Sequence, residues 1–105
     1  MSFIIIYITH HSEESAKDLC NQLLEKKLIA CSNIFPMTSA YWWQGAIQHE
    51  AEQVSIVKTI PSLWEKVKTE VERLHTYEVP CIMKMEVEAN AAYEEWIAEM
   101  VCQNE

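Results

Sequence analysis

The chain has 105 residues, half of them hydrophobic, and carries 16 acidic against 8 basic side chains, a net charge of −8. This length fits one domain, residues 1–105, with enough apolar residues for a core. The acidic balance argues against nucleic-acid binding, which needs a basic surface, and against binding to anionic membranes.

The cysteine pattern and the N-terminal segment bear on the compartment. The four cysteines are not arranged in any CxxC pair, and the apolar run FIIIYI is too short, and lacks the basic flank, for a signal peptide. No segment approaches the roughly 20 apolar residues that span a bilayer. We therefore expect a cytoplasmic protein with reduced thiols and no membrane insertion. The cysteines are Cys20, Cys31, Cys81 and Cys102.

The first two predicted elements are a central strand and an amphipathic helix. Residues 3–9 are apolar on both alternating faces, which is typical of a strand buried on both sides. Residues 12–27 repeat apolar side chains at helical spacing, with Ser12 as the expected N-cap. The apolar helix positions are Ala16, Leu19, Cys20, Leu23 and Leu24.

Residues 28–59 read as one long β-hairpin whose tip holds Gly45, the only glycine of the chain. Each arm has about 15 residues, which at about 3.3 Å per residue would reach roughly 45–50 Å. A domain of this length has a radius of gyration near 13 Å, by general scaling. The hairpin should therefore extend beyond its own domain and require a partner.

Pro36 interrupts the first arm of this hairpin. Proline lacks an N–H group, so it belongs at a sheet edge or a bulge, and it should separate an inner half, residues 28–35, from an outer half, residues 37–43. At the tip we predict a three-residue loop with Gly45 in the left-handed conformation. A two-residue loop would place Gln44 at positive φ, which is unfavourable for glutamine.

The second half of the chain predicts two helices around a strand. Residues 62–75 form a helix with a capping box of Ser62 and Glu65. Residues 81–88 alternate as a half-buried strand near an edge, and Asn90 caps a last helix. The inward strand positions are Cys81, Met83, Met85 and Val87, and the outward ones Lys84, Glu86 and Glu88. The last helix carries Tyr93, Trp96, Ile97, Met100 and Val101 on one side.

This order predicts an α+β fold, a ferredoxin-like βαββαβ sandwich with a C-terminal helix, in which two helices cover one face of a four-stranded antiparallel sheet. The other face would be bare, although residues 3–8 and 28–35 are apolar on both sides. An apolar sheet face needs a cover. We therefore expect an obligate homo-oligomer.

Five strings resemble one family over essentially the whole chain. They are LIACSNI at 28–34, YWWQGAI at 41–47, KT at 58–59, HTYEVP at 75–80 and YEEW at 93–96. In order and spacing they resemble the CutA family of divalent-cation-tolerance proteins. The resemblance implies a fold like the P-II signalling proteins, a cytosolic homotrimer, a link to divalent metals, copper above all, and no established enzymatic activity.

The chain departs from that family at two places. Thr76 stands where the family usually has the proline of HPYEVP, so that loop should be less rigid. The glycine that members often carry before the last helix is absent, with Ala89 and Asn90 in that region.

The candidate metal ligands are His75, Glu78 and Cys81, three donor types within seven residues beside Pro80. Imidazole and thiolate suit copper and zinc, whereas no pair shows a strong metal spacing such as CxxC. The alternative is that all three are ordinary structural residues. The His10-His11 pair is a second candidate, for adventitious metal.

A P-II-like small-molecule site is the other open possibility. Lys58, Tyr77 and Lys84 could hold a small anion in a cleft between subunits, although the chain lacks the Gly-rich phosphate motifs. Nucleophilic catalysis by Cys81 with His75 is disfavoured, since no Ser-based elbow is present and no glycine remains for an oxyanion loop. We expect no organic cofactor.

The hairpin should supply the oligomer interface, because aromatic side chains at a protruding tip anchor interfaces more often than they bind ligands. The expected interface residues are Pro36, Tyr41, Trp42, Trp43 and Gly45. The resulting hypothesis is a non-enzymatic cytosolic homotrimer that responds to divalent metal and binds it weakly. The alternatives are a regulatory trimer that binds a small molecule at subunit clefts and a scaffold that docks partner proteins.

Overall fold

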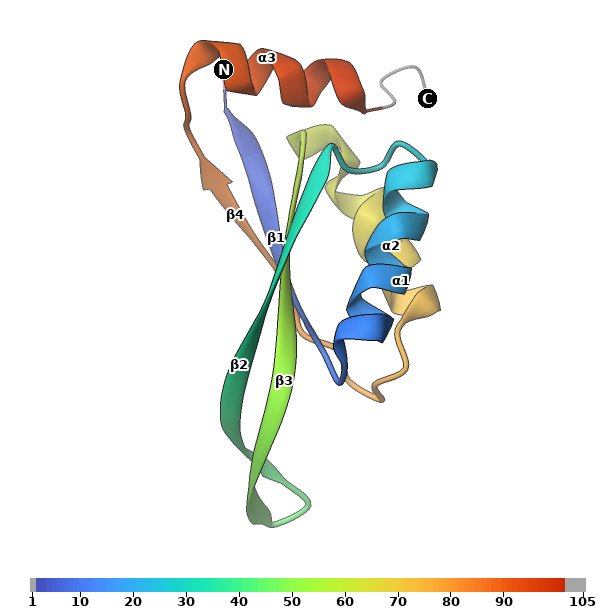
Figure 1. The fold of residues 1–105 in the computed structure, drawn as a ribbon, viewed down its shortest axis with the longest axis vertical. Coiled ribbons are helices and arrows are strands. Elements are labelled where there is room, and N and C mark those ends of the chain that lie inside the picture. The colour runs from blue at the N-terminus through green and yellow to red at the C-terminus, as the bar shows by residue number, and fades with distance from the viewer. Residues whose placement is uncertain (1, 102–105) are drawn as a thin grey trace.

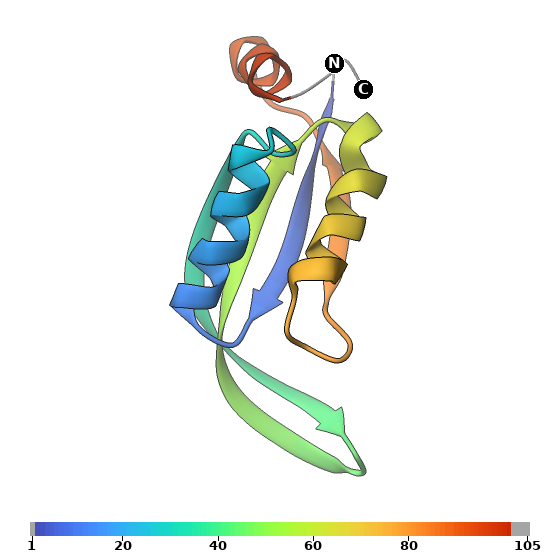
Figure 2. The same ribbon diagram turned by 90° about the vertical axis from the view of Figure 1, so that its right-hand side faces the viewer.

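The computed structural model describes residues 2–101. The elements are β1 (Phe3–His10), α1 (Glu13–Glu25), β2 (Cys31–Trp43), β3 (Ala46–Thr59), a short 3₁₀ helix η1 (Pro61–Leu63), α2 (Trp64–Leu74), β4 (Ile82–Val87) and α3 (Ala91–Met100). The strands form one antiparallel sheet in the order β2-β3-β1-β4, which confirms the predicted sheet. Helices α1 and α2 cover one face of it, and α3 lies across one end (Figures 1 and 2).

The core lies between β1 and the two covering helices. Ile4, Ile6 and Ile8 are fully buried on the helix side, where they pack with buried residues of α1, α2 and β3. Ile5 and Tyr7 alternate with them, and both are half-buried on the opposite side. That second side is called the open face below. The central position of β1 is confirmed. Within the described chain, the open face is covered only at one end, where Tyr93 of α3 lies against Phe3 and Lys58.

Helix α1 begins as predicted. The Ser12 hydroxyl oxygen accepts a hydrogen bond from the Ser15 N–H at 3.1 Å, so Ser12 is the N-cap. The helix ends at Glu25, two residues earlier than expected, because Lys27 adopts the left-handed conformation at φ 58°. Such a residue terminates an α-helix.

The predicted capping box of α2 is wrong. Pro61 opens the 3₁₀ turn η1, and α2 proper begins only at Trp64. The structure records no side-chain capping bond at the start of either helix, so Ser62 and Glu65 do not form the expected reciprocal pair. The fixed φ of proline suits the first position of such a turn.

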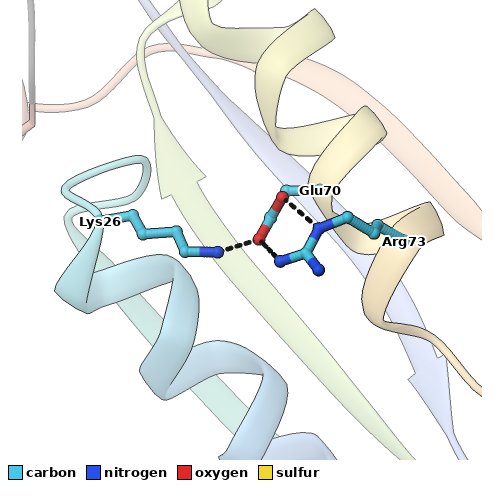
Figure 3. A network of polar contacts seen from close by, with 3 residues as sticks. All are labelled: Lys26, Glu70 and Arg73. Atoms are coloured by element: carbon cyan, nitrogen blue, oxygen red, sulfur yellow. Dashed lines mark hydrogen bonds and ion pairs between the residues drawn. The ribbon is translucent and has the colours of Figure 1, made fainter.

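A three-residue polar network ties the end of α1 to α2 (Figure 3). The Glu70 carboxylate accepts hydrogen bonds from the Arg73 guanidinium at 3.1 and 2.6 Å, and from the Lys26 ammonium. Arg73 first, and Lys26 second, lower the pKa of Glu70 to about 2. The network therefore stays ionised at any pH near neutrality.

The hairpin extends beyond the domain, as predicted. Strands β2 and β3 pair without a break from Cys31 to the tip, whereas β1 pairs only with the part of β3 from Gln53 onward. Residues 37–43 and 46–52 therefore have no third strand, and we call them the overhang (Figure 1). The molecule measures 45 × 26 × 21 Å. Pro36 pairs opposite Gln53, where the overhang begins, on the edge strand where a proline is tolerated.

The predicted three-residue tip is wrong. Trp43 pairs directly with Ala46, so the loop consists of Gln44 and Gly45 alone. Their φ angles are 51° and 81°, and positive φ at both central positions is the property of a type I′ turn. The twist of that turn matches the twist of the two strands, and this favours it despite the unfavourable glutamine.

The last two elements expose apolar residues that were expected to face inward. Met83 and Met85 of β4 lie beside Tyr7 and Ile5 on the open face and are 49% and 45% exposed. In α3, Ile97 is buried while Trp96 and Met100 are exposed, and Asn90 precedes the helix without a side-chain capping bond. The alternation of β4 is therefore confirmed, but the burial of its methionines is not found in the described chain.

Candidate functional site

A cleft of about 750 Å³ lies on the open face, between the overhang and the segment that follows α2. We call it the open-face cleft. Strands β1, β2 and β3 and residues 77–81 contribute to its lining. The lining includes Met37, Tyr41, Glu50, Glu52, Tyr77 and Glu78.

The strand register places two carboxylates side by side in this cleft. Glu50 and Glu52 are two residues apart in β3, so their side chains leave the strand on the same face. They lie opposite Ser39 and Met37 of β2, which also line the cleft. The same alternation brings Tyr41 to this face.

Each of the two carboxylates accepts a hydrogen bond from a tyrosine. The Tyr77 hydroxyl donates to Glu52 at 2.5 Å, and the Tyr41 hydroxyl donates to Glu50 at 2.5 Å. The Glu50 bond raises the pKa of Tyr41 to about 12, while burial and then the Glu52 bond raise that of Tyr77. Both phenols therefore remain protonated donors at neutral pH.

Glu52 is the more enclosed of the two acids. Its side chain belongs to the overhang, yet the residue is only 8% exposed, and its carboxylate is bound to the Tyr77 hydroxyl. Neither Glu50 nor Glu52 forms an ion pair with any basic residue in the part of the chain that the structure describes. The cleft thus combines a buried carboxylate, an exposed carboxylate and aromatic walls.

His75 lies outside this cleft and uses both ring nitrogens within the fold. Its Nδ1 accepts a hydrogen bond from the Tyr77 N–H at 3.1 Å, so its Nε2 carries the proton and donates to the Thr9 carbonyl at 2.7 Å. With this arrangement, neither nitrogen offers a lone pair to a metal. The ring instead positions the segment that carries Tyr77 into the cleft.

The structure separates the predicted metal ligands. Glu78 and Cys81 line the open-face cleft, whereas His75 lines a small cavity of about 110 Å³ on the helix side. Among residues 2–101, no group of three His, Cys, Asp or Glu side chains is arranged to hold a metal ion. Burial, and then the charge of Glu52, raise the pKa of the Cys81 thiol, so it is not a thiolate at neutral pH.

The second metal candidate, the His10-His11 pair, is also divided. His10 is 1% exposed, and its Nε2 lies 2.8 Å from the Ser55 hydroxyl, whereas the exposed His11 ring lies near Tyr77. His10 is therefore a core residue. The sequence indicates its burial, since His10 continues the alternation of Ile4, Ile6 and Ile8 onto the helix side.

Lys58, Tyr77 and Lys84 do not gather within one chain. Lys58 lies on the open face near α3, where its ammonium donates to the Tyr93 hydroxyl at 3.1 Å and this bond raises its pKa. Lys84 lies on the opposite face, 5.3 Å from the centre of the Trp64 ring. Of these three residues, only Tyr77 lines the open-face cleft.

Sequence reasoning missed Glu50 and Glu52 as site residues. Two acids at positions two apart in a strand would share one face, and this was the available signal. Their tyrosine partners come from other elements, so the pairing itself depends on the tertiary fold.

The predicted interface residues lie on the overhang and at its base. Trp42 is 72% exposed, and Tyr41 and Trp43 are each more than a third exposed. Gly45 lies at the tip and Pro36 at the base. Their interface role stays a prediction.

Of the cysteines, Cys20, Cys31 and Cys81 are free thiols, and Cys102 lies outside the described residues. No helix in the described range is long and apolar enough to cross a membrane.

Comparison with known proteins gives consistent similarities in sequence. A family model described as CutA1 divalent ion tolerance protein matches residues 4–100. The divalent-cation tolerance protein CutA of Pyrococcus horikoshii is 39% identical over 97 residues, which are 91% of this chain and 95% of that protein. Its counterpart in Archaeoglobus fulgidus is 43% identical with the same coverage.

Solved structures give the same similarity in three dimensions. A crystal structure of CutA1 from Pyrococcus horikoshii has a TM-score of 0.92 at 37% identity, covering 95% of this chain and 99% of that one. CutA1 from Oryza sativa has a TM-score of 0.94 at 33% identity, with coverages of 99% and 97%. The periplasmic divalent cation tolerance protein CutA from Archaeoglobus fulgidus has a TM-score of 0.90 at 42% identity, with coverages of 95% and 98%.

Proposed function

The chain belongs to the CutA1 divalent ion tolerance protein family, and on this premise we propose that it acts in tolerance of, or response to, divalent metal ions, copper above all. The family is one of tolerance proteins and not of enzymes. The match over residues 4–100 is the observation that carries the proposal.

Weak binding of the ion is part of this proposal. Glu78 and Cys81 line the open-face cleft beside Glu52, so a carboxylate and a thiol are available there. A structural zinc site uses four protein ligands, and a site with fewer must complete its coordination with water. His75 would have to give up its bonds to Thr9 and Tyr77 before it could join them.

Titration of the purified protein with Cu²⁺ and Zn²⁺ tests this function. We expect Cys81→Ser and Glu78→Gln to weaken Cu²⁺ binding severalfold, and His75→Ala to leave it nearly unchanged. His49→Ala removes an exposed histidine of β3 and is the matched control. Absence of Cu²⁺ binding by the unaltered protein contradicts weak metal binding, and binding that ignores Cys81 and Glu78 contradicts this choice of ligands.

We further propose that the protein is a homotrimer. Phe35, Met83 and Met85 are exposed on the open face, and a monomer rarely leaves an apolar surface of this kind uncovered. The overhang, which has no third strand, and its exposed aromatic residues support assembly through the hairpin. Light scattering at micromolar concentration tests the assembly, and the mass of a single chain would contradict it.

A cytoplasmic location is proposed from the cysteines, since Cys20, Cys31 and Cys81 are free thiols. The compartment differs among relatives. The Archaeoglobus fulgidus structure is described as periplasmic, and a rice relative as chloroplastic. Cell fractionation with an antibody to the protein decides the compartment, and a periplasmic or organellar signal would contradict the proposal.

A second candidate function is regulation, in which a P-II-like trimer binds a small molecule at subunit clefts. The observation that favours it is the open-face cleft, whose volume of about 750 Å³ falls within the range of small-molecule sites. Thermal-shift screening of metabolites tests it, because a ligand that binds only the folded state raises the melting temperature. A scaffold that docks partner proteins is the remaining alternative.

A further inference from the structure

We propose that His75 is a proton-sensitive switch, which holds residues 76–80 in place while its ring is neutral and releases them when the ring is protonated. The released segment carries Tyr77, whose hydroxyl ties this part of the chain to Glu52 at the base of the overhang. His75 lines the small cavity on the helix side of the sheet. The switch therefore requires no access to the open face, which the proposed homotrimer covers.

The two hydrogen bonds of the His75 ring fix its protonation state. The Tyr77 N–H can only donate, so Nδ1, 3.1 Å away, must present a lone pair. The Thr9 carbonyl can only accept, so Nε2, 2.7 Å away, must carry the proton. Only the neutral ring with its proton on Nε2 satisfies both partners. A proton added to Nδ1 would place two N–H donors against each other, and the bond to Tyr77 would be lost.

The histidines at the end of β1 allow only one charge at this position. The His10 ring stacks on the His75 ring with centroids 5.4 Å apart, so a charge on one ring disfavours a charge on the other. Burial first, and His75 second, lower the pKa of His10 to about 4. The exposed His11 ring lies 6.4 Å from the Tyr77 ring. Because His10 is buried and His75 is only half-buried, His75 is the ring of the stacked pair that takes the proton.

The small cavity of about 110 Å³ offers the protonated ring a different partner. Asp18 of α1 is the only acid in its described lining, and Gln22 adds a polar side chain, whereas α2 contributes only Leu74. A carboxylate stabilises an imidazolium beside it and accepts its N–H bonds. The neutral ring thus bonds to Tyr77, and the charged ring is drawn toward Asp18. These are two arrangements of one side chain, selected by one proton.

Residues 76–80 are poised to open when the bond to His75 is lost. Within the described chain, the hydrogen bonds of this segment are those of Tyr77, to His75 and to Glu52. Thr76 and Glu78 are exposed, and Val79 is 72% exposed. Segments with few hydrogen bonds and little burial are the first to open locally. Protonation of His75 removes one of the two bonds and leaves only the bond to Glu52.

A pH titration of the ¹⁵N-labelled full-length protein between pH 7.5 and pH 5, followed by NMR, tests the switch. Imidazole ¹⁵N shifts report the tautomer and the protonation of His75, and the backbone signal of Tyr77 reports its N–H bond. We expect the Nε2–H tautomer at pH 7.5, and a change in the Tyr77 signal with the same midpoint as the protonation of His75. Hydrogen exchange of the Tyr77 amide, corrected for its intrinsic pH dependence, should become at least about tenfold faster across this midpoint. The amide of Leu23, buried in α1, should keep its protection.

The variant His75→Asn removes the switch. The side-chain oxygen of asparagine can accept from the Tyr77 N–H in place of Nδ1, but it does not titrate. The Tyr77 signal and its exchange should therefore not respond to pH in this variant. His49→Asn removes an exposed histidine of β3 and is the matched control, in which the full response should remain.

Four results would overturn the proposal. The first is a His75 ring that carries its proton on Nδ1 at pH 7.5 or stays neutral down to pH 5. The second is a Tyr77 amide that does not respond when His75 is protonated, and the third is an equal response in His75→Asn. The fourth is loss of Leu23 protection at the same midpoint, since this would be unfolding of the whole chain. The titration of the unaltered protein decides the matter even where His75→Asn fails to fold.

Discussion

The imidazole rings of His10 and His75 stack, with their centroids 5.4 Å apart and their planes inclined by 14°. His10 closes β1 and contacts the Ser55 hydroxyl at 2.8 Å, while His75 follows α2 and donates to the Thr9 carbonyl. The pair therefore joins the end of the central strand to the segment that carries Tyr77 into the open-face cleft. A charge on either ring would act directly on this junction.

Acidification should destabilise the protein through His10. Burial first, and His75 second, lower the pKa of His10 to about 4, whereas in the unfolded chain it remains near 6.5. Between these values the unfolded state binds more protons than the folded state. The contribution of His10 to the free energy of unfolding is therefore complete above pH 6.5, falls as the pH drops, and levels off below about 4. This loss in the free energy of unfolding should be at most about 3 kcal/mol. Urea unfolding across this pH range would measure it.

The variant His10→Gln isolates this effect. Glutamine keeps a polar contact for Ser55 but does not titrate, so the variant should be less stable at pH 7 and show a flatter pH dependence between 6.5 and 4. The other groups that act on His10 are His75, His11 and Glu52, and they remain in the variant. His49→Gln removes an exposed histidine and should keep the original slope. An unchanged slope in His10→Gln would contradict the assignment.

The two tyrosine–carboxylate bonds of the open-face cleft should differ in strength. Tyr77→Phe leaves the 8% exposed Glu52 without its donor, and loss of a bond to a buried charged group costs about 1–3 kcal/mol. Tyr41→Phe removes the corresponding bond to the exposed Glu50, and water can replace it there. Thermal unfolding at pH 7 should show a clearly larger loss for Tyr77→Phe. Equal losses would mean that Glu52 is solvated in solution.

Apolar alternation was enough to predict the framework. The pattern of Ile4, Ile6 and Ile8 predicted a central strand, and the helical spacing of Leu19 and Leu23 predicted the buried face of α1. These predictions succeed because burial of a strand or helix face is a local, periodic property of the sequence.

The candidate site depends on contacts between distant parts of the chain. The His75 ring donates a hydrogen bond to the Thr9 carbonyl, 66 positions away, and the Glu52 carboxylate accepts one from Tyr77, 25 positions away. No local pattern encodes such contacts. The proximity of His75 and Cys81 along the chain therefore predicted that they share a metal site. In the fold, the two side chains line two different cavities.

The hairpin tip offers a paired test of backbone conformation. Gly45 adopts φ 81°, and no atom lies within 4 Å of the position that a Cβ would take. Gly45→Ala should therefore cost about 1–2 kcal/mol through backbone strain alone. Gln44, at φ 51°, should accept asparagine with a small gain in stability, because Asn-Gly is the preferred type I′ pair. Urea unfolding of both variants measures these changes, and a destabilised Gln44→Asn would argue against the two-residue turn.

The Glu70 network should stabilise the helix layer in a pH-dependent manner. The pKa of Glu70 is lowered to about 2 by Arg73 and Lys26, so its contribution is present above the ordinary glutamate pKa near 4.5 and is lost as the pH falls toward 2. We expect Glu70→Gln to lower the melting temperature by a few degrees at pH 7 and by nothing near pH 2. Glu72→Gln, an exposed acid of the same helix, is the control. A deficit that persists at pH 2 would point to a packing defect.

The overhang should contribute to stability through assembly and not within its own chain. Trp42 is 72% exposed, so Trp42→Ala removes few contacts inside one subunit. If the protein is a homotrimer anchored by these aromatics, Trp42→Ala and Trp43→Ala should lower the mass seen by light scattering from three times the 12.3 kDa chain mass toward one. Their melting temperatures should then depend more strongly on protein concentration, since dissociation accompanies unfolding.

The control for this last experiment is Trp64→Phe. Trp64 lies half-buried on the helix side of the sheet, away from the overhang, and the ammonium groups of Lys68 and Lys84 lie 5.5 and 5.3 Å from the centre of its ring. Its replacement should lower stability at every concentration without changing the mass, because the defect lies inside each subunit. Unchanged mass and melting in both overhang variants would place the interface elsewhere, with the exposed Met83 and Met85 of the open face as the next positions to replace.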